Sequence, residues 1–285
     1  MPKKLLKPII KTDKKLDIIL ENVGDMALKR RARLMIEGLE LKIGDKILDV
    51  GCGDAFYLHL LSNLGGDLKL AGCDIDTVAL KSAKQNLKGK NIQFKEADLM
   101  KKIPYVSNTF DKVVMSEVAE HLPNDVKGLK EIYRVLKPGG ILVLSVPNKN
   151  YPLFWDPVNW ILERTTGNHV KNGFWAGIWY NHIRLYKPEQ IKKAVEKAGF
   201  KVEQVRAVTW WCLPFNHNLI NLMARLLYGG SLSPEIAKSV SKYEKSVKRP
   251  MMIEVLFKIV NIFDRVNEVF HLKNIGAGVF VKAVK

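Results

Sequence analysis

The chain contains few cysteines and fewer acidic than basic residues. Only three of its 285 residues are cysteine, at Cys52, Cys73 and Cys212, and they stand far apart. This scarcity excludes a disulfide framework and a paired CxxC zinc site, and it favours a reducing compartment. With 29 acids against 46 bases, the formal net charge is +17. Such an excess attracts polyanions, either nucleic acid or an anionic membrane surface, and charge alone does not decide between them.

A long uninterrupted apolar run is also missing. The basic N-terminal segment has apolar pieces only at residues 5–6 and 9–10, too short for a secretory signal, so we expect a cytoplasmic protein. The most apolar stretch, residues 251–272, is interrupted by charged side chains such as Glu254 and Lys258, which disfavours a simple membrane span. The composition, 47% apolar and 26% charged, is that of a folded chain.

Short β-branched runs alternate with amphipathic stretches, which is the pattern of a parallel sheet covered by helices. The predicted strands are residues 46–50, 69–73, 91–95, 112–116, 141–146, 201–209 and 278–284. The predicted helices of this alternation are residues 55–64, 77–87, 125–136 and 188–198. The sequence therefore predicts an α/β fold.

A glycine turn follows the first predicted strand, with Gly51 and Gly53 between Asp49 and Asp54. A strand, a tight glycine turn and a helix start bring backbone close to a ligand. A dinucleotide is disfavoured because Phe56 replaces the third glycine of GxGxxG and the two acids would repel a pyrophosphate. The sulfonium and ammonium of S-adenosylmethionine suit these carboxylates better, and a purely structural turn is the alternative.

Further acids follow the next two predicted strands. Asp74 stands about twenty residues after the glycines, the usual place for an acid that accepts both ribose hydroxyls. Ile75 either packs on the adenine or belongs to the core, and Asp98 either accepts from the adenine amino group or caps a helix. Because ligands of open α/β sheets bind at the carboxyl ends of the strands, these acids favour a nucleoside site there.

Five motifs in succession, ILDVGCGDA, GCDID, EADL, SNTFDKVVMSEVAEHL and LKPGGILVLSVPN, resemble those of class I S-adenosylmethionine-dependent methyltransferases. The resemblance is strong over about residues 40–148. It implies a doubly wound, seven-stranded, mostly parallel sheet whose last strand is antiparallel, with S-adenosylmethionine as the cofactor. The residues that it assigns to the cofactor are Asp49, Gly51 and Gly53 for the methionine part, Asp74 for the ribose, and Asp98 and Leu99 for the adenine.

We expect one core domain with three additions. The core consists of a cofactor-binding part (44–148), a helix and strand (188–209) and a final strand (276–285), and the additions are a basic N-terminal arm and helix (1–43), an aromatic cap insert (149–187) and an amphipathic helical insert (210–275).

The segment SEVAEH, residues 116–121, follows the fourth predicted strand. In a helical turn Glu117, Glu120 and His121 would share one face and could hold a divalent metal. The pattern resembles that of ubiquinone-biosynthesis O-methyltransferases and small-RNA 2′-O-methyltransferases, which implies a metal at these positions and a further histidine, matched by His182. Other small-molecule methyltransferases carry an EHL segment, here residues 120–122, without metal, where the glutamate, Glu120, would contact cofactor and His121 substrate. Either histidine could take the proton of an acceptor hydroxyl.

Residues 151–186 hold nine of the 25 aromatic residues of the chain. These side chains could line an apolar acceptor pocket that excludes water, form a small satellite core, or do both.

The helical insert has wide apolar faces at residues 218–228 and 251–272, with basic residues between them at 238–249. One stripe consists of Met252, Val255, Ile259, Phe263, Val266 and Phe270. Apolar faces beside basic ones suit a helix in an anionic membrane interface, and ten bases between Lys3 and Arg33 add to this. The alternative is that the stripes pack on one another or across a dimer, with solvated lysines.

The sequence thus predicts a methyltransferase for a hydrophobic small-molecule or lipid-like acceptor of the quinone or lipid type, with an anionic membrane surface as a candidate partner. An RNA 2′-O-methyltransferase and a methyltransferase-like binding protein without turnover are the alternatives. Nucleic acid is the weaker partner, because no recognised RNA-binding module is attached. Neither the acceptor atom nor the oligomeric state follows from the sequence.

Overall fold

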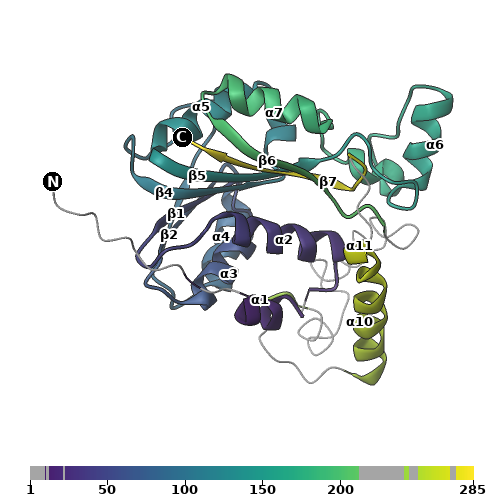
Figure 1. Cartoon of the computed structure of the whole chain (residues 1–285), viewed down its shortest axis with the longest axis horizontal. Coiled ribbons are helices and arrows are strands. Elements are labelled where there is room, and N and C mark those ends of the chain that lie inside the picture. Colours follow the sequence, from purple (N-terminus) through teal and green to yellow (C-terminus); the bar gives the residue numbers. More distant parts are fainter. Residues whose placement is uncertain (1–9, 11–12, 22, 212–240, 244–249, 270–273) are drawn as a thin grey trace.

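A seven-stranded sheet organises the chain in this computed structural model (Figure 1). The structure describes residues 10, 13–21, 23–211, 241–243, 250–269 and 274–285. The strands are β1 (Lys46–Val50), β2 (Lys69–Asp74), β3 (Ile92–Glu96), β4 (Phe110–Ser116), β5 (Leu136–Pro147), β6 (Lys201–Val208) and β7 (Gly278–Val284). Their order is β3-β2-β1-β4-β5-β7-β6, and β7 runs antiparallel to both of its neighbours. The predicted fold is confirmed.

Helices cover both faces of this sheet (Figure 1). One face carries α1 (Asp13–Leu20), α2 (Met26–Gly38), α3 (Phe56–Leu64) and α4 (Thr77–Asn86), and the other carries α5 (Asp125–Val135) and α7 (Pro188–Lys197). The helix α5 follows the usual amphipathic rule, since Leu129, Ile132 and Val135 on its buried side are three residues apart. In α3 most side chains are buried, because α1 and Tyr243 cover the side that the sheet leaves open.

The N-terminal helix α2 is packed directly on the sheet. It begins at Asp25, whose carboxylate accepts hydrogen bonds from the amides of Ala27 and Leu28. Ala32, Met35 and Ile36 are buried in the same core cluster as strand residues of the sheet. The described part of residues 1–43 therefore shares the core of the sheet, and α2 brings its polar residues to the carboxyl edge.

Strand β5 begins at Leu136, five residues before the predicted start, and two further differences from the sequence-based expectation have a local reason. Ala55 adopts a left-handed conformation (φ 69°), so α3 begins at Phe56. Glu117 is left-handed as well (φ 55°), and the only helical turn in residues 116–121 is a short 3-10 helix, Ala119–His121. The condition for a shared face, a single helical turn from Ser116 to His121, is therefore not met, and Glu117 does not share a helix face with His121.

The aromatic insert forms a small core of its own against α2. It contains α6 (Pro157–Thr165) and a 3-10 helix, Phe174–Trp179. Tyr151, Trp155 and Trp179 are buried there with Met26. Other aromatic side chains of the insert are at least one third exposed, namely Phe154, Phe174, Trp175 and Tyr180.

The helical insert is described in part, as residues 241–243, α10 (Met251–Asp264) and α11 (Val266–Val269). The predicted apolar face at 218–228 and most of the bases at 238–249 lie outside the described residues. Among the helices that the structure describes, none combines the length and the apolarity needed to cross a bilayer.

Candidate active site at the carboxyl edge of the sheet

The glycine turn after β1 is held against β2 by backbone hydrogen bonds. The amides of Gly51 and Cys52 donate to the carbonyl of Cys73 at 2.8 and 3.0 Å. Gly51 (φ 66°) and Gly53 (φ 51°) are left-handed. A Cβ on Gly51 would lie 2.3 Å from Cγ2 of Val118, whereas a Cβ on Gly53 would meet nothing within 4 Å. Gly51 is therefore required by close packing as well as by its conformation.

The acid at the end of β2 is joined to this turn. The carboxylate of Asp74 accepts from the amide of Gly53 at 2.8 Å and from the amide of Asp76 at 2.9 Å. Each of its oxygens has a second lone pair, so the carboxylate can still accept from a vicinal diol. Ile75 is 64% exposed beside it and does not belong to the core.

After β3, Asp98 and Leu99 form a turn rather than a helix start. Asp98 accepts from the amide of Met100 at 2.8 Å, and Leu99 is buried in the core. The carboxyl ends of β1, β2 and β3 thus bring together all seven residues expected at the cofactor, which are Asp49, Gly51, Gly53, Asp74, Ile75, Asp98 and Leu99.

Asp49 is the buried member of this group. Its side chain is nearly inaccessible, and Oδ2 has no hydrogen-bond partner within the described residues. Burial raises the pKa of this carboxyl well above its ordinary value, and the nearby charges of Asp74 and Asp54 raise the pKa further. A cation at this edge would relieve both effects, so the residues fit the positively charged methionine part of S-adenosylmethionine.

Two residues of the helical insert, Lys242 and Tyr243, contact the glycine turn after β1. Lys242 Nζ lies 2.8 Å from a carboxylate oxygen of Asp54, and the Tyr243 hydroxyl donates to the Asp54 carbonyl at 2.9 Å. Tyr243 also meets the rings of Phe56 and His59 edge to face. One of the bases expected on a membrane-facing segment is therefore engaged at the glycine turn.

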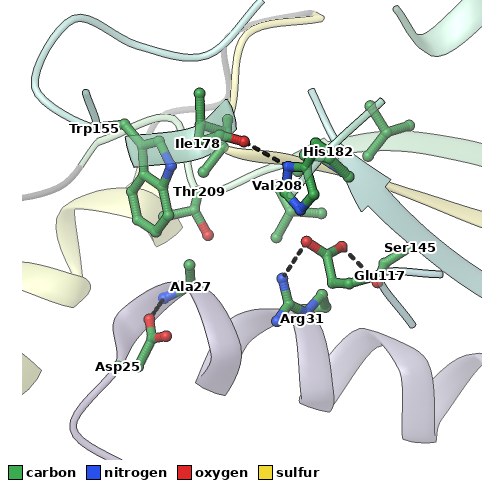
Figure 2. A pocket seen from close by; sticks show the side chains of 14 residues that line it. Asp25, Ala27, Arg31, Glu117, Ser145, Trp155, Ile178, His182, Val208 and Thr209 are labelled. Atoms are coloured by element: carbon green, nitrogen blue, oxygen red, sulfur yellow. Dashed lines mark hydrogen bonds and ion pairs between the residues drawn. The ribbon is translucent and has the colours of Figure 1, made fainter. Parts of the chain in front are cut away.

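Glu117 points into a hydrogen-bonded network instead of toward Glu120. Its carboxylate accepts from Ser145 Oγ at 3.0 Å and lies 3.2 Å from Nη1 of Arg31 (Figure 2). The network continues from Ser145 through Ser116 to the hydroxyl of Tyr57, at 2.9 and 3.0 Å. Burial lowers the pKa of Arg31 but the Glu117 carboxylate raises it, and the net shift is upward, so the guanidinium stays charged.

Glu120, His121 and His182 converge beside this network. One ligand atom from each lies within 4.8 Å of the others, and Glu117 is outside the group. Glu120 Oε1 is 3.8 Å from Nε2 of His121 and 3.9 Å from Nε2 of His182. The backbone brings them together, because the Ile183 amide donates to the Glu120 carbonyl at 3.2 Å.

The hydrogen bonds of the two histidines define their tautomers. Nδ1 of His121 lies 3.0 Å from the carbonyl of Asn181, and Nδ1 of His182 bonds the carbonyl of Ile178. A carbonyl only accepts, so each Nδ1 is the donor, and Nε2 of the neutral ring carries a lone pair. Glu120 is fully buried and neither carboxylate oxygen has a hydrogen bond within the described residues. Burial, and then the charge of Glu117, raise the pKa of Glu120 well above its ordinary value.

A cavity of about 190 Å³ opens between α2 and the ends of β5 and β7 (Figure 2). Trp155 and Ile178 form an apolar wall, and Arg31, Glu117 and His182 provide polar groups. Sequence reasoning missed Arg31, Ser145 and Thr209 among the lining residues. Arg31 stands in the basic run KRRAR of α2, which indicates a cationic helix but not that this residue faces the site.

Comparisons with known proteins identify relatives of this chain. Residues 48–144 match the family described as "Methyltransferase domain". The chain is 30% identical over 189 residues to demethylmenaquinone methyltransferase of Staphylococcus carnosus (strain TM300), covering 63% of this chain and 77% of that one. It is 24% identical over 169 residues to ubiquinone biosynthesis O-methyltransferase of Thiobacillus denitrificans, covering 59% and 69%. The solved structure of the [4+2]-cyclase SpnF aligns with a TM-score of 0.56 at 19% identity, covering 89% and 79%.

The sheet order, the glycine turn and these similarities define one class of protein. The chain belongs to the class I S-adenosylmethionine-dependent methyltransferases, and it resembles those of quinone biosynthesis. It is therefore a transferase whose cofactor is S-adenosylmethionine. The likeness to a cyclase shows that this fold also carries other chemistry, so the assignment depends on the sequence similarity and not on the fold alone.

The buried carboxyl of Asp49 predicts a stability that depends on pH. Because its pKa is raised in the folded state, the folded protein keeps this proton to higher pH than the unfolded chain does. This group's contribution to stability therefore falls as the pH rises from about 4, the ordinary range of an aspartate. We expect Asp49→Asn to raise the urea midpoint of the cofactor-free protein at pH 7, with a smaller difference from wild type near pH 4.

The exposed Asp67 supplies the matched control, and Asp67→Asn should show no pH-dependent difference from the wild type. An Asp49→Asn protein that is equally destabilised at both pH values would contradict this account of the carboxyl.

Proposed function

We propose that the protein transfers the methyl group of S-adenosylmethionine to a hydroxyl of a hydrophobic, ring-bearing acceptor of the quinone-biosynthesis type. The observation that carries the proposal is the cavity in which an apolar wall of Trp155 and Ile178 faces His182 and Glu117. The names of the relatives, demethylmenaquinone methyltransferase and ubiquinone biosynthesis O-methyltransferase, support a quinone-type acceptor. A volume of about 190 Å³ suits one ring better than a nucleotide within an RNA chain.

In this proposal the residues at the ends of β1, β2 and β3 hold the cofactor, which supplies an electrophilic methyl group on its sulfonium. Asp49 would face the cationic part, and Gly51 and Gly53 would let backbone approach it. Asp74 would accept from the ribose hydroxyls. The adenine would lie by Asp98, Ile75 and Leu99.

The catalytic side would be formed by the two histidines and Glu117. A hydroxyl acceptor must lose its proton during transfer, and Nε2 of His121 or His182 carries the lone pair that can take it. Glu117, fixed by Arg31 and Ser145, would orient the acceptor in the cavity. The apolar wall would exclude water, so that alignment of hydroxyl and methyl provides most of the rate.

We expect Asp74→Ala to weaken cofactor binding more than a hundredfold in calorimetry with S-adenosylmethionine. The change removes two hydrogen bonds to a charged acceptor, on the order of 3 kcal/mol. Glu189→Ala, an exposed acid on α7, is the control and should bind normally. Normal binding by Asp74→Ala would show that this carboxylate does not hold the ribose.

The same site has the chemistry of a divalent metal centre. Glu120, His121 and His182 offer one carboxylate and two Nε2 lone pairs, and both Nδ1 donors are bonded to backbone carbonyls, as metal-ligating histidines usually are. As the alternative to proton transfer onto Nε2, we therefore propose that these lone pairs bind a metal, which would polarise the acceptor hydroxyl. Glu117 would become a ligand only by leaving Arg31, so we propose three protein ligands with Glu117 as a candidate fourth.

Chelation tests the metal centre. With a catechol as acceptor, excess chelator should abolish turnover, and magnesium, manganese or zinc should restore it. His121→Asn and His182→Asn should each lower kcat by about 10²- to 10⁴-fold and weaken Mn²⁺ binding measured by electron paramagnetic resonance. His169 lies in the aromatic insert but outside the cluster, and the control variant His169→Asn should retain both turnover and Mn²⁺ binding. Full activity in chelator would leave His121 and His182 as proton acceptors only.

We also propose that the protein works at an anionic membrane surface. The outer face of α10 carries Met251, Val255, Ile259 and Ile262, which are 83, 48, 40 and 64% exposed. Val260 packs on the opposite side, against the small aromatic core. Of the predicted stripe, Val255, Ile259 and Phe263 are at least partly exposed, and Met252 and Phe270 lie outside the described side chains. An exposed apolar face on a chain of net charge +17 suits anionic lipid.

Vesicle sedimentation checks this surface. We expect binding to phosphatidylglycerol vesicles but not to phosphatidylcholine vesicles, weakened by salt, and reduced about tenfold or more by Ile259→Asp with Ile262→Asp. Ile18→Asp with Val106→Asp, at exposed positions elsewhere, is the control. If the protein binds neither kind of vesicle and binds RNA with a steep salt dependence, the alternative function, an RNA methyltransferase, is favoured instead.

A further inference from the structure

A second cavity, of about 500 Å³, is lined by residues of α2, the end of β6 and α10, and its α2 residues differ from those that line the acceptor cavity. Its lining contains five cationic residues, Lys29, Arg30, Arg33, Arg206 and Arg265. Three acidic residues also line it, Glu21, Glu37 and Asp264. The two cavities share Val208 and Thr209, so the end of β6 is a common wall.

Two of the acids are already engaged with two of the cations. Arg30 Nε lies 2.5 Å from Oδ1 of Asp264, and Arg33 Nη1 lies 3.8 Å from Oε1 of Glu37. Arg33 also pairs with Asp17, outside the cavity. These pairs join α2 to α10 and to α1, and they balance the charges of Arg30 and Arg33.

Lys29 and Arg265 have no carboxylate at ion-pair distance among the described residues. Lys29 Nζ bonds the neutral amide oxygen of Asn261 at 2.8 Å. Lys29 is half-buried, and burial lowers its pKa. The charges of Asp264 and Glu21 raise this pKa and those of Arg33 and Arg30 lower it, and the net shift is downward. A half-buried ammonium beside further cations is stabilised when an anion enters the cavity.

We infer that this cavity is a binding site for a phosphate-bearing ligand, held by Lys29 and Arg265 with Arg206 at the strand end. Guanidinium groups match phosphate oxygens in pairs, and an ammonium adds a point charge. The phosphate could belong to a soluble ester or to an anionic lipid headgroup, because α10 carries cavity residues beside its exposed apolar face. The inference does not depend on the identity of the methyl acceptor.

The test uses the full chain saturated with S-adenosylmethionine, so that the cofactor site is filled and cannot bind the added pyrophosphate. Pyrophosphate is titrated by calorimetry, and binding to phosphatidylglycerol vesicles is measured separately with and without pyrophosphate. Lys29→Gln with Arg265→Gln is compared with Lys193→Gln with Lys197→Gln, an equal change of charge at exposed positions of α7 on the opposite face of the sheet. Glutamine keeps a donor for Asn261, and cofactor binding reports that each variant is folded.

We expect saturable, salt-sensitive pyrophosphate binding that the cavity variant weakens at least tenfold and the control retains. Nuclear magnetic resonance of the Lys29 ammonium should show a rise of its pKa when the anion binds. If the cavity variant binds vesicles more weakly and pyrophosphate competes with vesicle binding, the ligand is a lipid headgroup. If vesicle binding is unchanged, the ligand is a soluble phosphate ester. No saturable binding to either probe, or equal binding by the cavity variant, would overturn the inference whether or not methyl transfer is active.

Discussion

The ion pair between Arg31 and Glu117 joins α2 to the loop after β4, and the arrangement of the residues around the first cavity depends on it. Without Arg31, the Glu117 carboxylate would stand beside the buried Glu120 with no opposite charge near it. With Arg31 in place, Glu117 turns toward Ser145, and the Glu120–histidine cluster stays separate. The pair lies at the wall of the cavity between α2 and the ends of β5 and β7, where partial burial strengthens each charge interaction. One contact therefore positions α2, the left-handed Glu117 and the cavity together.

The sequence predicted the elements of the fold best where the signal lies in a short stretch of chain. Most of the seven strands and the four predicted helices between them were expected within one or two residues, because alternation of apolar and polar residues and the glycine turns are local signals. The exceptions are β5, which begins at Leu136 and not at 141, and α6, which was not expected. Asp49, Asp74 and Asp98 were predicted to lie together for the same reason, since the carboxyl ends of parallel strands meet at one edge, and the structure places them there. His182 was linked to His121 only through the family pattern, and the structure brings the two rings to 4.9 Å.

What the sequence did not predict depends on contacts between distant segments. Arg31 is one of several bases in α2, and only the packing of that helix on β5 and β7 decides which of them faces the site. The left-handed backbone of Glu117 broke the expected helical face, although its residue type gave no sign of it. Neighbouring bases of the same helix line a different cavity, so residues of a single run, KRRAR, face two cavities.

Tyr243 and Lys242 limit how far the helical insert can be shortened. Their contacts with Asp54, Phe56 and His59 cover the outer side of the helix that follows the glycine turn. A shortened chain that lacked them would expose apolar side chains of α3 directly behind the cofactor site and would leave Asp54 without its ammonium partner. The helical insert is therefore not an appendage that can be exchanged between relatives as a unit, and a chimaera must retain residues 241–243 or redesign the surface of α3 together with it.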